Sequence, residues 1–74
     1  MSELIVDGIS YKLKTPEGIP TVEVKDIQNK HSAALRLNEK GRFFIVSSTF
    51  PKMGKRYFEM LYVAEINKGR IWGN

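Results

Sequence analysis

The stretch of the sequence best suited to chemistry is one in which basic and aromatic side chains are interleaved, between Arg36 and Phe58. Lysine and arginine neutralise phosphate oxygens with release of counterions, and unstacked bases lie against aromatic rings. The basic members are Arg36, Lys40, Arg42, Lys52, Lys55 and Arg56, and the aromatic members are Phe43, Phe44, Phe50, Tyr57 and Phe58. The stretch therefore predicts a surface that binds nucleic acid.

The distribution of charge supports this interpretation. Residues 1–30 carry four lysines against five acidic residues, a balance of −1, whereas residues 31–74 carry eight basic residues against three acidic ones, a balance of +5. Seven of the eight aromatic residues follow residue 40. We expect phosphate contacts from Arg42, Lys52, Lys55 and Arg56, base stacking on Tyr57 and Phe44, and additional contacts from Arg36 and Lys40.

One segment within this stretch, Leu35–Ile45, contains an asparagine followed by a Lys-Gly-Arg-Phe turn and an apolar strand. It resembles the strand–turn–strand of the PUR (purine-rich-element-binding) repeats over about eleven of the 74 residues. The resemblance implies binding of single-stranded nucleic acid on a curved sheet and points to Arg42 and Phe44. Repeats of that family end in a long helix, whereas Lys55–Ile66 looks more strand-like in this sequence.

Enzymatic chemistry has little support in the composition. The chain has no cysteine and a single histidine, His31, in a polar stretch, so neither a metal set nor a nucleophile–base pair is visible. The glycines are scattered singly rather than grouped in a phosphate-binding loop. We expect a non-enzymatic accessory or regulatory protein without a cofactor that binds DNA or RNA, single strands preferred.

A different class of function fits the same net charge of +4. A small interaction module or inhibitor, of the kind common among phage and mobile-element products, would dock its basic face on an acidic protein partner. The first ten residues resemble no signal peptide, and no apolar run approaches the ~20 residues needed to cross a bilayer. These features predict a cytoplasmic protein without membrane association.

Turn signals divide the chain into short segments. Asp7-Gly8 suits a type I′ hairpin turn, Thr15–Gly18 has proline and glycine at turn positions, and Asn38–Gly41 indicates a second hairpin. Asn67–Gly69 suggests a third. The spacing predicts a single domain over residues 1–74, mainly β, with an antiparallel meander or a barrel-like sheet.

Residues 55–66 allow two interpretations. As a strand, Lys55–Ile66 presents apolar side chains at every second position from Phe58, and Lys55 and Tyr57 share the other face. As a helix it would turn the fold into an antiparallel sheet with one C-terminal helix near residues 56–67, which its Glu, Met, Leu and Ala residues favour. We prefer the strand, because its neighbours are hairpin-like.

The strand interpretation defines a core and a route to association. The predicted core comprises Val6, Ile9, Leu35, Leu37, Ile45, Phe58, Met60, Ile66 and Trp72. Truncation of Phe58 to alanine should then cost roughly 3–5 kcal/mol. Leu61 and Val63 would lie on the opposite face, so we expect a homodimer formed through that face or through an unpaired sheet edge.

Overall fold

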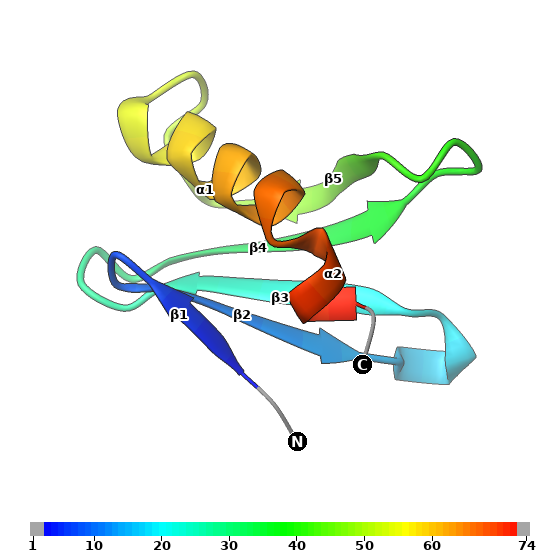
Figure 1. Cartoon of the computed structure of the whole chain (residues 1–74). Helices are drawn as coiled ribbons and strands as arrows, with labels where there is room; N and C mark the ends of the chain where they lie inside the picture. Colours follow the sequence, from blue (N-terminus) through cyan, green and yellow to red (C-terminus); the bar gives the residue numbers. More distant parts are fainter. Residues whose placement is uncertain (1–2, 73–74) are drawn as a thin grey trace.

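The computed structural model describes residues 3–72, which form a five-stranded antiparallel sheet followed by two helices (Figure 1). The strands occur in the sheet in chain order. They are β1 (Leu4–Val6), β2 (Ile9–Lys14), β3 (Thr21–Asp26), β4 (His31–Leu37) and β5 (Phe43–Ser48), and the helices are α1 (Lys55–Ile66) and α2 (Lys68–Trp72). The predicted mainly β meander is confirmed, with the C-terminal helix of the alternative interpretation.

The turns form where glycine and asparagine predict them. Asp7 and Gly8 both have positive φ, 51° and 77°, as a type I′ turn between β1 and β2 requires. At the β4–β5 turn, Gly41 has a φ of 77° and its N–H donates to the carbonyl of Asn38 at 2.9 Å. The third predicted hairpin is wrong, because Asn67 ends α1 and α2 follows directly.

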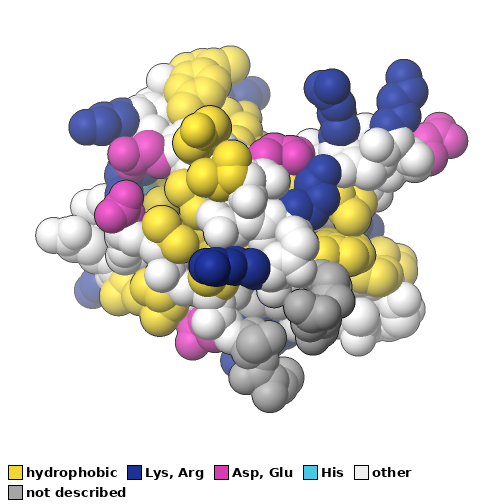
Figure 2. Space-filling view, viewed as in Figure 1, with side chains coloured by type: hydrophobic (Ala, Val, Ile, Leu, Met, Phe, Trp, Pro, Cys, Tyr) yellow, Lys and Arg dark blue, Asp and Glu magenta, His cyan; other side chains and the backbone are white. Residues whose placement is uncertain are grey.

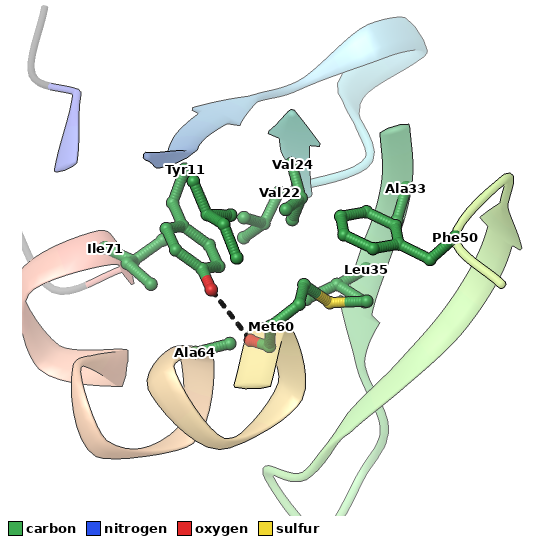
Figure 3. Close-up of a cluster of buried hydrophobic side chains, with 10 residues drawn as sticks. Tyr11, Val22, Val24, Ala33, Leu35, Phe50, Met60, Ala64 and Ile71 are labelled. Carbon is green, nitrogen blue, oxygen red and sulfur yellow. Dashed lines mark hydrogen bonds between the residues drawn. The ribbon is translucent and has the colours of Figure 1, made fainter. Parts of the chain in front are cut away.

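The helices cover one face of the sheet (Figure 1). Strand alternation sends the apolar side chains of β2, β3 and β4 to this face, where α1 contributes Met60 and Ala64. The buried cluster consists of Ile9, Tyr11, Val22, Val24, Ala33, Leu35, Phe50, Met60, Ala64 and Ile71 (Figure 3). The buried Tyr11 hydroxyl donates to the Met60 carbonyl at 2.8 Å, which ties β2 to α1.

The preferred strand over Lys55–Ile66 is wrong. A single sheet with one apolar face needs another element to cover it, and a sixth strand would have left that face exposed to water. The apolar residues at every second position belong to two series, each with a spacing of four residues. The two series lie on opposite faces of α1 and interleave along the sequence, which produces the alternation. Met60 and Ala64 face the sheet, whereas Phe58, Tyr62 and Ile66 face solvent.

The helix also changes the predicted core. Ile9, Leu35 and Met60 are buried as expected, and Ile45 and Trp72 pack against the core while partly exposed. Val6 and Leu37 are likewise only partly buried. Two assignments are wrong: Phe58 and Ile66 are 52% and 62% exposed, so the large cost expected for truncating Phe58 does not apply. Leu61 and Val63, assigned to the face away from the core, pack against it.

Candidate functional site

The face of the sheet that the helices leave open carries most of its polar residues. Strand pairing brings these side chains into three cross-strand rows, with neighbouring strands about 4.8 Å apart. The rows are Lys14–Thr21–Arg36–Phe44, Lys12–Glu23–Ala34–Ser47 and Ile5–Ser10–Lys25–Ser32. We call this surface the open face. It combines four basic side chains, several hydroxyls and one aromatic ring.

The open face has an excess of positive charge. Lys14 pairs with Glu23 at 3.4 Å, and the Ser10 hydroxyl donates to the Glu3 carboxylate. Within residues 3–72, no carboxylate lies at ion-pair distance from Lys12, Lys25 or Arg36. A polyanion that reaches this surface therefore meets three cations that do not first have to leave an ion pair.

Arg36 and Phe44 are directly opposed on β4 and β5. The Arg36 Nε donates to the Thr21 hydroxyl at 3.1 Å, which orients the guanidinium across the sheet. The Phe44 side chain is 45% exposed although it belongs to a strand. The structure thus brings together two of the predicted site residues, one able to bind phosphate and one able to stack on a base.

Lys40 and Arg42 lie at the end of the sheet, on the β4–β5 turn. The Asn38 side-chain oxygen accepts from both of their backbone N–H groups, at 2.9 and 3.0 Å, so the turn is held in one conformation. Figure 2 shows basic side chains projecting from this end of the molecule. The two residues help to line a hollow of about 570 Å³ between the turn and α1.

Lys52, Lys55 and Tyr57 lie on the helix side of the molecule, away from the open face. Lys52 and Tyr57 line a second hollow of about 510 Å³, beside Ile45 on β5. The prediction that Lys55 and Tyr57 point the same way is wrong, because residues two apart on a helix are about 200° apart around its axis. Lys55 is exposed, whereas Tyr57 packs against the core.

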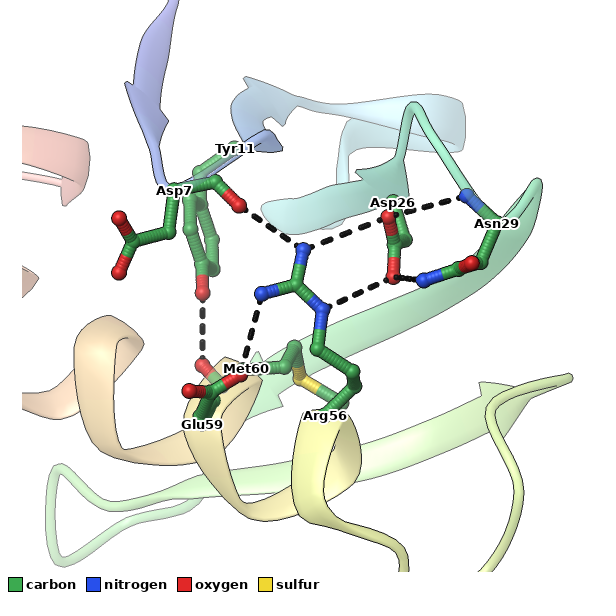
Figure 4. Close-up of polar contacts among 7 residues, drawn as sticks. All are labelled: Asp7, Tyr11, Asp26, Asn29, Arg56, Glu59 and Met60. Carbon is green, nitrogen blue, oxygen red and sulfur yellow. Dashed lines mark hydrogen bonds and ion pairs between the residues drawn. The ribbon is translucent and has the colours of Figure 1, made fainter.

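Arg56 occupies a different environment, at the centre of a polar cluster between α1 and the sheet (Figure 4). Its Nε lies 3.2 Å from the Asp26 carboxylate, and its Nη1 lies 3.0 Å from Glu59. Its Nη2 donates to the Asp7 carbonyl at 2.8 Å. The guanidinium therefore has intramolecular partners on three sides, and Arg56 is not part of the open face.

The electrostatics of this cluster match its geometry. The Asp26 side chain is fully buried, and hydrogen bonds from Arg56 lower the pKa of its carboxyl group to about 2. Asp26 and Glu59 in turn raise the pKa of Arg56. Burial raises the pKa of the neighbouring Tyr11 well above its ordinary value, so the hydroxyl remains a donor at neutral pH. The cluster is a structural ion pair that joins α1 to the β1–β2 and β3–β4 connections.

The α1–α2 junction is attached to the β4–β5 turn by a second polar contact. The Glu65 carboxylate accepts from the Phe43 N–H at 3.1 Å and pairs with Lys68 at 3.1 Å, and both contacts lower its pKa. Lys68 also donates to the Gly41 carbonyl. These bonds fix the position of the hairpin that presents Lys40 and Arg42.

Three lysines of the open face, Lys12, Lys14 and Lys25, were not predicted from the distribution of charge. They belong to the half of the chain with a net charge of −1, so the regional net charge gave no indication of a basic surface there. The period-two alternation of Ile9–Lys14 and Thr21–Asp26 was the signal that could have located them, since it separates their polar residues from the buried apolar ones.

Comparison with protein-family models, curated proteins and solved structures found no match to this chain. The similarity to PUR repeats therefore remains a resemblance over Leu35–Ile45. Among residues 3–72, no three His, Asp or Glu side chains are grouped so that they could hold a metal ion. Neither helix in that range is long and apolar enough to span a bilayer.

Proposed function

We propose that this protein binds single-stranded nucleic acid on the open face of its sheet, without catalysis, as an accessory or regulatory factor. The observation that carries the proposal is the row Lys14–Thr21–Arg36–Phe44, in which an exposed aromatic ring lies beside an arginine that faces no carboxylate among the described residues. Lys12 and Lys25 extend the positive surface across the sheet, and Lys40 and Arg42 extend it beyond the end of β4.

The shape of this surface favours a single strand over a duplex. Sequence-reading proteins usually place a helix or a two-stranded ribbon in the major groove of a duplex, whereas α1 lies against the core here. An open sheet can instead hold splayed bases, with rings stacked on its aromatic residues and phosphates near its cations. The exposed hydroxyls of Ser32 and Ser47, in the same rows as the lysines, supply additional hydrogen bonds to phosphate or sugar.

The proposal is tested by fluorescence anisotropy with labelled oligothymidine, oligouridine and a duplex of equal length, over a range of salt concentrations. We expect binding at low salt that weakens steeply as salt is added, with single strands bound more tightly than the duplex. Replacement of Lys12 and Lys25 together by alanine should lower the magnitude of the salt slope by about 1.4, since each lost contact to a single strand contributes about 0.7.

The matched control replaces Lys52 and Lys55 by alanine, which removes the same charge from the helix side. Its salt slope should change much less than that of the Lys12/Lys25 variant. Phe44→Ala should weaken binding about 5- to 150-fold with little change in slope, because it removes stacking worth roughly 1–3 kcal/mol and no charge.

Equal losses in the two lysine pairs would contradict the assignment to the open face. An absence of binding to every oligonucleotide at low salt would reject the function, and an acidic protein partner would then be the explanation to test for the same surface.

A further inference from the structure

The outer face of α1 carries three large hydrophobic side chains that have no counterpart in the fold of one chain. Phe58, Tyr62 and Ile66 are 52%, 66% and 62% exposed. Their spacing of four residues places them in one line along the helix, opposite Met60 and Ala64. We call this line the outer stripe. Figure 2 shows hydrophobic side chains gathered over α1, on the side away from the sheet.

The stripe is partly preorganised for contact. The Phe58 ring meets the Tyr57 ring edge to face, with centroids 5.4 Å apart and an interplanar angle of 81°. Tyr57 in turn packs against the core, so the fold supports one side of the exposed Phe58 ring. An aromatic side chain that is already restrained loses little entropy when a partner covers it.

The charges carried by α1 and by its junction with α2 are close to balance, although the chain as a whole has a charge of +4. Glu59 pairs with Arg56 at 3.0 Å and Glu65 pairs with Lys68 at 3.1 Å. Lys55 adds one charge at the start of the helix. A helix that lies on a lipid surface usually has lysine and arginine along its polar face, whereas a surface that meets its own copy must avoid repulsion between like charges.

We propose that the outer stripe docks on the same stripe of a second copy of this chain. In a two-fold dimer the same patch serves both partners, so a near-neutral apolar line is self-complementary. The three side chains expose roughly 350 Å² per copy, taking about 200 Å² for a fully exposed aromatic side chain and slightly less for Ile66. That is about half of the ~800 Å² that each partner buries in a standard interface, with the surrounding charged residues as its rim.

This dimer differs from the one that the sequence predicted, since Leu61 and Val63 face the core. The stripe points away from the sheet, so the two sheets would lie outermost with their open faces directed away from each other. One dimer would then bind two separate strands of nucleic acid. This consequence alone rests on the proposed function.

Sedimentation equilibrium of the isolated protein tests the dimer, and because no nucleic acid is present, its result is independent of the binding proposal. We expect the wild-type protein to approach twice the chain mass of 8.5 kDa as its concentration rises. Tyr62→Asp, at the centre of the stripe, should raise the dissociation constant at least about 30-fold, as expected for loss of a central interface aromatic. Its melting temperature at a concentration where both proteins are monomeric should match that of the wild type.

Ile27→Asp is the matched control, because Ile27 is 59% exposed in the β3–β4 turn and does not belong to the outer stripe of α1. This variant should dimerise like the wild type. A wild-type chain that stays monomeric at millimolar concentration would overturn the proposal, and so would a dimer that survives Tyr62→Asp.

The absence of cysteine allows a second measurement. Tyr62 is the midpoint of the stripe, so a two-fold contact brings both copies of this position close to the axis. Tyr62→Cys should be joined into a covalent dimer by a short thiol cross-linker, and Ile27→Cys should not. Equal cross-linking of the two variants would also overturn the assignment.

Discussion

The two faces of the sheet use charged side chains in different ways. On the helix-covered face, Asp26 is fully buried and is matched by Arg56, which contacts two carboxylates and a carbonyl. On the open face, Arg36 makes one side-chain hydrogen bond, to Thr21, and faces no carboxylate within residues 3–72. Arg36 and Arg56 count equally in the composition of the chain. Arg56 nevertheless stabilises the fold, whereas Arg36 is available to an anionic ligand.

This difference shows why a count of charges is a poor guide to a binding surface in so small a chain. Arg56 belongs to the most basic part of the sequence and is engaged inside the protein, whereas Lys12 and Lys25 belong to the least basic part and lie on the open face. The face on which a residue lies depends on strand alternation and helix rotation, not on the local density of charge.

The largest expected effect compares the two arginines directly. Arg56→Met should lower the free energy of unfolding by about 3–5 kcal/mol, because it leaves the buried Asp26 carboxylate without its counterion. Arg36→Met should change it by less than about 1 kcal/mol, since only one hydrogen bond is lost. Urea denaturation measures both. Similar losses in the two variants would mean that the two faces do not differ in this way.

The second prediction sharpens the same comparison through pH. The folded-state pKa of Asp26 is about 2, below its ordinary value of 3.8, so the unfolded chain binds the proton more readily. The resulting stabilisation, about 2 kcal/mol, is present above pH 4 and is lost as the pH falls from about 4 to 2. Thermal unfolding over this range should show a smaller pH dependence for Asp26→Asn than for the wild type. Equal slopes would contradict the assignment of this ion pair.

The smallest effect concerns a buried and an exposed hydroxyl. Tyr11→Phe should cost about 1 kcal/mol, because the Tyr11 hydroxyl donates to the Met60 carbonyl inside the core. Tyr62→Phe removes the same atom from a side chain that is 66% exposed and should be nearly neutral. Chemical denaturation at low protein concentration, where self-association is minimal, provides the measurement. A neutral Tyr11→Phe would indicate that water replaces the lost bond.

Local sequence signals predicted the strands and turns of residues 4–48, for identifiable reasons. Asp7-Gly8 adopts positive φ at low cost, and Asn38 and Gly41 close the second hairpin through side-chain and backbone bonds. The candidate surface was predicted only in part, since Arg36 and Phe44 lie together on the open face while Tyr57 and Lys55 lie on the helix side. The helix was misassigned because interleaved i, i+4 stripes produce the same alternation as a strand.

The sequence by itself determined the class of fold, because alternation and turn chemistry act over a few residues and need no distant partner. Tertiary structure alone decided that residues 55–66 are helical, since the apolar face formed by β2, β3 and β4 needs a cover that a further strand cannot provide. It also decided the role of each arginine: Arg56 meets Asp26, thirty residues away, only after the chain has folded. Contacts between such distant residues depend on the packing of whole elements, which no local pattern encodes.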